Sequence, residues 1–418
     1  MKETLISSGG NNMNMAVLDL FSGCGGLSQG FKEAGFNVVV ANEIWAPAAD
    51  TYEKNHPETN MIRGNITSVT VKKKILDCFK EGKCDVIIGG PPCQAYSVAG
   101  LRKPDDPRGK LFRDYMQMVS KLQPKVFVME NVKGLLSIMI DKKRLKPSQK
   151  AEIKKLNDMK EKKISLLLKR RTSNTKKDAE FTESDETKLK GIIKKIEKKQ
   201  KEIRPFQERL IERIKRDFKR MGYEVDFRVL NSAKYGVPQL RERIILIGTR
   251  DGIQIEFPEP THALDTKASP SLQPFMTVRD AIDDLKELKE HPEMNHVFSI
   301  HTEGFLKKIR NTKLGENISE AANAFHRAIP DKPSWTVKDN HGSVFIHYEK
   351  DRVMTPRELA RLQSFDDSYF FCSSKKNIYT QIGNAVPPRL AYAIAECVKK
   401  MLKEKNEEKI QVMLPEAC

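Results

Sequence analysis

The sequence predicts an α/β fold, namely a doubly wound, mostly parallel β-sheet accompanied by a smaller, irregular domain. The stretch over residues 15–43 has the pattern strand, glycine-rich turn, helix, strand. Further short apolar runs near residues 86–88, 126–129, 224–229 and 244–247 continue the pattern. Alternating helices and strands with short turns are typical of parallel strands that are covered by helices on both faces.

The first unit contains a candidate ligand loop. A strand over Met15–Phe21 leads into the small residues Ser22-Gly23-Cys24-Gly25-Gly26, a helix over 27–34 and a strand over 36–41. Small residues let a backbone approach a ligand closely. Glu43 follows Gly25 by about 18 residues, where an acidic side chain can accept hydrogen bonds from ribose hydroxyls. The loop lacks the dinucleotide pattern GxGxxG, so it predicts a nucleoside-type cofactor, with an ordinary glycine turn as the alternative.

A proline-stiffened loop follows the apolar run Val86-Ile87-Ile88. Its sequence is Gly89-Gly90-Pro91-Pro92-Cys93-Gln94. Consecutive prolines fix φ and remove two backbone donors, which restricts the loop geometry. In open α/β sheets, chemistry gathers beyond the carboxyl ends of strands. Cys93 is therefore a candidate nucleophile, and the alternative is a small buried residue in a tight turn.

Two more segments place charged side chains beside predicted strands. Glu130-Asn131-Val132 follows the strand 126–129, and a glutamate there either caps a helix or does chemistry with a raised pKa. The run Gln239-Leu240-Arg241-Glu242-Arg243 precedes the strand 244–247. Alternation puts Gln239, Arg241 and Arg243 on one face. Two arginines on one face suit an anion or a carboxylate, and a strand-edge salt bridge is the alternative.

A basic insert interrupts this rhythm over residues 141–203. It contains 22 Lys and Arg against 11 Asp and Glu. We expect a pair of charged helices joined by a polar turn near Thr172–Ser184. The insert is either a solvated hairpin or a basic arm that touches a phosphate backbone.

The domain organisation follows from these segments. We expect a catalytic domain over 15–250, a smaller domain over 251–370, and a C-terminal loop and helix over 379–405 that complete the first domain. Gln381-Ile382-Gly383-Asn384-Ala385-Val386-Pro387-Pro388 is predicted to be a small-residue loop that opens this last helix.

Composition narrows the class of partner. Lys and Arg outnumber Asp and Glu by 74 to 56, a net charge of +18, which favours nucleic acid over a membrane. Seven cysteines without a CxxC pair indicate neither a disulfide framework nor a metal site. No apolar run is long enough for a signal or membrane segment. We expect a soluble, cytoplasmic protein.

Six blocks in order resemble the cytosine-C5 methyltransferases that act on DNA. They are FSGCGG, GGPPCQ, ENV, QLRER, RELARLQSF and QIGNAVPP. The resemblance runs from Ala16 to about Val398, apart from the basic insert and the variable region after Arg250. It implies a Rossmann-like domain that binds S-adenosyl-L-methionine and a target-recognition domain, with double-stranded DNA as the partner.

The resemblance also implies catalytic roles. Cys93 would attack C6 of cytosine, because C5 becomes nucleophilic only after aromaticity is broken. Glu130 would contact N3 and the 4-amino group, and it must be partly protonated to donate. Arg243 would bind O2, with Arg241 in support. The target cytosine must be flipped out of the duplex.

Cofactor contacts are implied in the same way. They are Phe21, Gly23, Gly25, Glu43, Asn65, Ile66, Pro92, Leu111 and Asn384. Asn65 departs from the aspartate common at its position. An amide oxygen can still accept a hydrogen bond, so we expect altered cofactor affinity rather than loss.

Three alternatives and several partner assignments complete the prediction. An RNA (tRNA) cytosine methyltransferase shares the motif order, but the long region 251–352 favours DNA. A silent DNA-binding scaffold would need none of Cys93, Glu130 and Arg243, so their presence argues against it. A nicotinamide oxidoreductase would need GxGxxG, which the sequence lacks. We expect a prokaryotic, monomeric enzyme of restriction-modification or orphan type, with a cognate endonuclease as a possible but not stably bound partner. Arg310, Arg327 and Lys338 are candidate DNA contacts.

Overall fold

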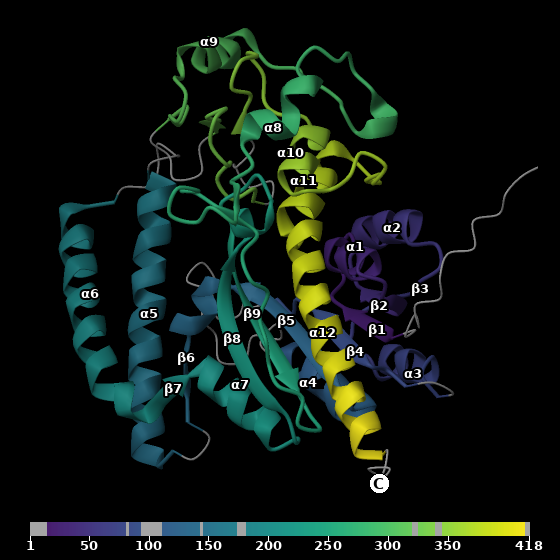
Figure 1. Ribbon diagram of the computed structural model, residues 1–418. Helices are drawn as coiled ribbons and strands as arrows, with labels where there is room; N and C mark the ends of the chain where they lie inside the picture. The colour runs from purple at the N-terminus through teal and green to yellow at the C-terminus, as the bar shows by residue number, and fades with distance from the viewer. Residues whose placement is uncertain are drawn as a thin grey trace, which may run out of the picture. The chain divides into compact units, whose positions relative to one another are not determined.

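A central seven-stranded sheet organises the computed structural model, which describes residues 15–80, 83–92, 111–142, 145–173, 181–319, 325–338 and 345–413 (Figure 1). The strands are β1 (Ala16–Leu20), β2 (Asn37–Glu43), β3 (Asn60–Arg63), β4 (Val86–Gly89), β5 (Val126–Val132), β8 (Glu224–Asn231) and β9 (Glu242–Thr249). Their order is β3-β2-β1-β4-β5-β9-β8. The first five are parallel, and β9 runs in the direction opposite to the other six strands. The prediction of a mostly parallel sheet is confirmed.

Helices cover both faces of this sheet. On one face, α1 (Gly26–Glu33) and α12 (Pro388–Met413) share a core with the strands, built from residues such as Phe31, Val86 and Ile394. On the other face, Tyr115 of α4 (Leu111–Leu122) donates hydrogen bonds to the Ile87 and Val128 carbonyls. The helices α2 (Ala46–Asn55) and α3 (Val69–Asp77) lie beside β2 and β3. The helix α7 (Leu210–Lys219) comes before β8 in the chain. None of the helices in the described ranges is both long and apolar enough to span a membrane.

Three local predictions differ from the structure. The strand β3 was absent from the sequence prediction because Asn60–Arg63 is short and half polar. The strand β5 extends to Val132 because it pairs with β9 along its full length, so Glu130 lies inside the strand. The run Gln381–Asn384 is the last turn of α11 (Lys375–Asn384) rather than a loop, and α12 begins at Pro388 after a short connection.

The region after β9 is irregular, as predicted, and has its own apolar core. Its elements are β10 (His262–Ala263), β11 (Gln273–Pro274), α8 (Val278–Ile282), α9 (Glu303–Asn311), β12 (His326–Arg327), β13 (Phe345–Ile346) and α10 (Pro356–Leu362). Residues including Val278, Val337 and Leu359 form the core together with Ile382 of α11.

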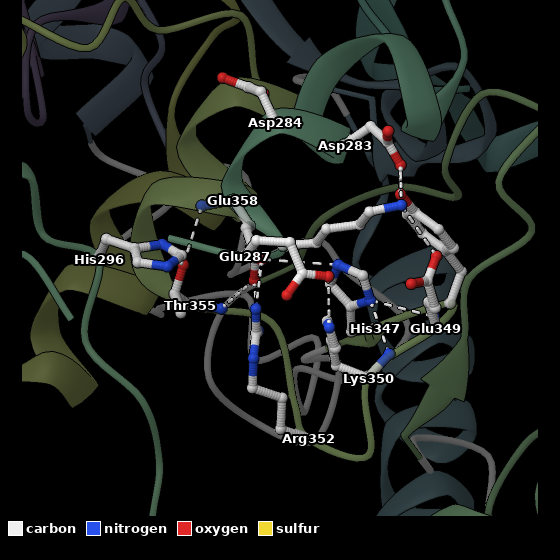
Figure 2. Close-up of polar contacts among 12 residues, drawn as sticks. Asp283, Asp284, Glu287, His296, His347, Glu349, Lys350, Arg352, Thr355 and Glu358 are labelled. Atoms are coloured by element: carbon white, nitrogen blue, oxygen red, sulfur yellow. Dashed lines mark hydrogen bonds and ion pairs between the residues drawn. The ribbon is translucent and has the colours of Figure 1, made fainter. Parts of the chain in front are cut away.

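A buried polar cluster accompanies this core (Figure 2). Glu358 is inaccessible to solvent and accepts two hydrogen bonds of 2.8 Å from Arg352 and one of 2.7 Å from the Thr355 backbone. The His347 Nδ1 atom accepts the backbone N–H groups of Glu349 and Lys350, each at 3.0 Å. These bonds fix the start of α10 and the loop before it.

The basic insert forms a compact unit of its own over Gly134–Asp217. Its helices α5 (Pro147–Ser173) and α6 (Glu183–Ile203) form a hairpin, and β6 (Met139–Asp141) pairs with β7 (Gln207–Arg209) at its base. The predicted pair of charged helices is confirmed. The described residues up to Lys133 and from Phe218 onward form the other unit.

Candidate active site

Glu130 and Arg243 form an ion pair on one face of the sheet. In the antiparallel register Val132 is opposite Arg243 and Glu130 is opposite Ile245, so these side chains point to the same side. The distance from Arg243 Nε to Glu130 Oε1 is 2.9 Å. The two side chains are only 15% and 13% exposed, so the pair is largely shielded from water but still reachable.

The proline loop begins beside this pair. Asn131 Nδ2 donates a 2.8 Å hydrogen bond to the Pro91 carbonyl, which fixes the loop against the end of β5. A Cβ atom placed on Gly90 would lie 3.2 Å from Glu130 Oε2, so the backbone passes directly over the carboxylate. Pro92, half-buried, is the last described residue here, and Cys93 lies outside the described residues. The chain is described again from Leu111, at the start of α4.

Arg241, two residues before Arg243 in the chain, is fully buried. Its guanidinium donates to the carbonyls of Val337, Gly383 and Ala385 at 2.8 to 3.0 Å. Burial, together with the charge of Arg243, lowers the pKa of Arg241 to about 9, so it stays protonated at neutral pH. All three acceptors are backbone carbonyls, so this side chain ties the segment just before β9 to Val337 and to the end of α11.

Gln239 and Gln363 extend the same connection. Gln239 Nε2 donates to Gln363 Oε1 at 2.9 Å, and Gln239 Oε1 accepts the Val337 backbone N–H at 2.9 Å. Gln363 Nε2 donates in turn to the Ile382 carbonyl at 2.6 Å. The sequence prediction assigns no role to Gln363. The position of Gln363 within the block RELARLQSF is the one sequence feature that points to its importance.

The glycine-rich loop is joined to the end of β2 through Glu43. Glu43 Oε2 accepts the Gly23 backbone N–H at 2.9 Å, and Oε1 accepts the N–H groups of Ile44 and Trp45. Gly23 has a φ of 56° and open space where a Cβ would be. Phe21 also has a positive φ, 59°, which is unusual for a residue with a side chain.

The same loop meets the block QIGNAVPP. A Cβ on Gly26 would lie 2.2 Å from the Val386 carbonyl oxygen, so only glycine permits this approach. Gly25, with a φ of 95°, faces His56 and Tyr369. Tyr369 donates a hydrogen bond to the Cys24 carbonyl. The structure thus joins two blocks that are more than 350 residues apart in the chain.

The remaining predicted cofactor residues are arranged as follows. Ile66 is buried, whereas Asn384 is exposed at the end of α11. The Asn65 side-chain oxygen accepts the Thr67 backbone N–H at 3.0 Å, in the turn before α3. The Asn65 amide oxygen, which we expected to accept a hydrogen bond from the cofactor, therefore already accepts one from the protein backbone.

One predicted DNA contact was wrong. Arg327 is buried, and its guanidinium donates to the Ile309 carbonyl and to Asp351, so it connects α9 to the loop before α10. Arg310 is exposed but paired with Glu303. Lys338 is exposed.

Comparison with known proteins identifies the family. The family model of the C-5 cytosine-specific DNA methylases matches residues 15–146 and 200–400. The Type II methyltransferase M1.HphI of Haemophilus parahaemolyticus is 35% identical over 405 residues, which cover 93% of this chain and 88% of the relative. The Type II methyltransferase M.FnuDI of Fusobacterium nucleatum is 30% identical over 95% of this chain and 98% of its own.

A solved structure agrees at the level of the fold. It is a putative DNA modification methyltransferase encoded within an E. coli prophage, with a TM-score of 0.61 and 22% sequence identity. It covers 93% of this chain and 100% of its own. Taken together with the matched family model, these relatives identify the chain as a member of the C-5 cytosine-specific DNA methylases.

Proposed function

We propose that this enzyme transfers a methyl group from S-adenosyl-L-methionine to C5 of a cytosine in one short sequence of double-stranded DNA. The observation that supports this most directly is the Glu130–Arg243 pair at the base of the loop that carries Cys93. A Type II role agrees with the names of the relatives. We place the enzyme in a prokaryotic restriction-modification system and in the cytoplasm. The protein acts as a monomer, and a cognate endonuclease would act on the same DNA without stable binding.

The residues around the glycine-rich loop fit the cofactor. The open space at Gly23 accommodates a ligand where a side chain would otherwise be. The carboxylate of Glu43 is held at the end of β2 by three backbone N–H groups, and its free lone pairs can accept the ribose hydroxyls. Phe21, Gly25, Asn65, Ile66, Pro92, Leu111 and Asn384 complete the proposed set of contacts. The cofactor supplies the methyl group.

Cys93 begins the chemistry on the substrate. Its thiolate adds to C6 of the cytosine, which breaks the aromaticity of the ring and places electron density on C5. After C5 is methylated, loss of the C5 proton re-forms the double bond and expels the Cys93 thiolate. C5 and C6 are out of reach inside the stacked duplex, so the cytosine must be flipped out first.

Glu130 and Arg243 hold the ring during this step. The N3 and O2 atoms of cytosine are adjacent on one edge, and an adjacent carboxyl and guanidinium match that order. Arg243 donates to O2, while Glu130 contacts N3 and the 4-amino group and stabilises the charge that develops on thiolate attack. Arg241 acts as a positioning residue, because its guanidinium is occupied by three carbonyls.

Transfer of labelled methyl groups tests this proposal. The full-length protein is incubated with labelled S-adenosyl-L-methionine and either unmethylated genomic DNA or total RNA, and the modified base is identified and mapped. We expect 5-methylcytosine in DNA at one short sequence. Label in RNA alone would assign the protein to RNA methylation, and label in neither would favour a silent DNA-binding scaffold.

A further inference from the structure

The helical hairpin of the insert is an addition to the family fold. The two segments matched by the family model leave out residues 147–199, which make up nearly all of α5 and α6. The 141–203 segment nevertheless contributes +11 of the net charge of +18. None of the proposed catalytic or cofactor-binding residues belongs to it, so its charge needs another explanation.

Both ends of the hairpin are closed by interactions within it. Near the base, Ile153, Leu156, Ile196 and Ile203 form a small buried core, and Lys199 pairs with Glu152. Near the tip, Lys169 and Arg170 of α5 pair with Asp185 and Glu186 of α6 at 2.5 and 3.5 Å. The acids of these pairs are thereby neutralised by basic residues of the same hairpin.

The middle of the hairpin is open. There an open groove of about 450 Å³ lies between α5 and α6. Leu166, Gly191 and Ile192 contribute to its floor, and Lys162, Lys188 and Lys195 contribute three ammonium groups. A Cβ on Gly191 would meet nothing within 4 Å, so the glycine is not required by packing within the hairpin and leaves the groove wider.

Within the part of the chain that the structure describes, the three groove lysines have no acidic partner. All are exposed, and no described residue forms an ion pair with Lys162, Lys188 or Lys195. Three like charges around one opening repel each other, and an anion between them relieves this repulsion. The apolar floor beside the lysines additionally suits a ligand that combines an anionic group with an uncharged sugar.

We propose that this groove binds the sugar-phosphate backbone of duplex DNA outside the recognised sequence. A phosphodiester offers the negative charge and the deoxyribose offers the less polar surface that the floor can cover. Backbone contacts of this kind give affinity without sequence information. The inference rests on DNA being the substrate, as proposed above.

Charge neutralisation along the groove tests the proposal by salt dependence. The variant Lys162→Gln/Lys188→Gln/Lys195→Gln is compared with Lys190→Gln/Lys194→Gln/Lys198→Gln, which removes the same charge from exposed positions of α6 that do not line the groove. Binding to a duplex of about 40 base pairs without the target sequence is measured between about 50 and 200 mM salt. We expect the slope of log K against log salt to fall by about 0.9 for each lost contact in the groove variant, so by about 2 to 3. The control should lose less than about 1.

A second pair of variants separates shape from charge. Gly191→Glu places a negative group in the groove, and Gly191→Gln places a neutral group of the same size there. Both replace a helix-interior glycine at a site with free space, so both should fold. We expect Gly191→Glu to weaken binding to the same duplex at least about tenfold more than Gly191→Gln does.

Other results would overturn the inference. Equal slopes for the groove variant and its control would mean that only overall charge matters. A self-association of the wild type that the groove variant abolishes, measured by light scattering without DNA, would assign the groove to a second copy of the chain. Binding is measured apart from methyl transfer. If the methylation assay fails but the salt slope of the groove variant falls as expected, the proposed function is refuted and this inference stands. Normal methylation with an unchanged slope would refute only the inference.

Discussion

Glu130 and Arg243 illustrate how a single residue pair gains its setting from two strands. Glu130 lies near the carboxyl end of the parallel strand β5, and Arg243 lies near the start of the antiparallel strand β9 beside it. Their side chains therefore meet where β5 ends and β9 begins. Neighbouring Glu242 points to the other face, where it pairs with exposed Lys133. Alternation along β9 therefore separates a candidate catalytic position from an ordinary surface ion pair by one residue.

Glu130→Gln should lower kcat for methyl transfer by about 10²- to 10⁴-fold, the range of a lost acid-base group. The amide keeps the size and polarity of the side chain, so the Kd for DNA should change little. Glu242→Gln is the matched control and should retain at least half of the wild-type rate. Equal activity of Glu130→Gln and the wild type would exclude the assigned role.

Cys93→Ser should abolish methyl transfer and leave DNA binding intact, because a serine hydroxyl is a far weaker nucleophile than a thiolate. The two properties are measured separately, by label transfer and by equilibrium binding to the mapped target sequence. Robust turnover by this variant would contradict the covalent mechanism.

Asp19 is a buried carboxyl in β1, shortly before the glycine-rich loop. The pKa of Asp19 is raised to about 7. Burial is the main cause and the charge of Glu43 adds to it, while the 2.6 Å hydrogen bond from Ser28 acts in the opposite direction. Between about pH 4 and 7 the unfolded chain has released this proton while the folded protein still holds it. The contribution of Asp19 to the free energy of unfolding is therefore lost as the pH rises through this range.

Asp19→Asn should remove this component of the pH dependence. The Tm measured from pH 5 to 8 should fall less steeply in the variant than in the wild type, and the asparagine oxygen can still accept from Ser28. Identical pH profiles would show that Asp19 titrates normally.

At the scale of elements, α10 is anchored by the charges before and within its first turn (Figure 2). Burial raises the pKa of Glu358, but the hydrogen bonds and charge of Arg352, with His347 nearby, outweigh it and hold the pKa below its ordinary value. The stabilisation that Glu358 provides is thus present at neutral pH and is lost as the pH falls through its lowered pKa. Burial lowers the pKa of His347 to about 4, so it is neutral at physiological pH.

Glu358→Gln should destabilise the fold by about 3–5 kcal/mol, because Arg352 would be left beside a neutral group in a buried site. Urea unfolding monitored by circular dichroism measures this. Glu287→Gln provides the control: its carboxylate pairs with Lys350 and is 70% exposed, so the change should stay below about 1 kcal/mol. Similar losses in both variants would contradict the importance of the buried cluster.

At the scale of the whole molecule, the insert is separable from the sheet. Its own core and hairpin lie within one compact unit, and the family model is interrupted at residues 147–199. A hairpin with these properties can be added to a methyltransferase without altering the residues proposed for catalysis.

Replacement of residues 147–199 by a short glycine linker should preserve the sequence that is methylated. It should also flatten the salt dependence of DNA binding by about 0.9 log units per lost contact. Mapping of methylated sites and a salt titration check the two parts separately. A changed target sequence would show that the insert takes part in recognition, and an unchanged slope would make it a solvated appendage.

The sequence by itself determined the fold class, the strands around the site and the paired helices of the insert. These depend on local patterns: apolar runs between glycine turns, and charged residues at helical spacing. Cys93 and Glu130 could be identified from the sequence for the same reason, because each comes shortly after an apolar run that predicts a strand.

Only the tertiary structure decided what the buried polar groups do. Arg241 and Arg243 occupy equivalent positions in the alternation, yet one donates to three carbonyls and the other pairs with Glu130. Arg327 was a candidate DNA contact and is instead buried, where its guanidinium donates to the Ile309 carbonyl and to Asp351. The role of a charged side chain depends on which distant carbonyl or carboxylate the fold brings within about 3 Å, and residue spacing along the chain does not contain that information.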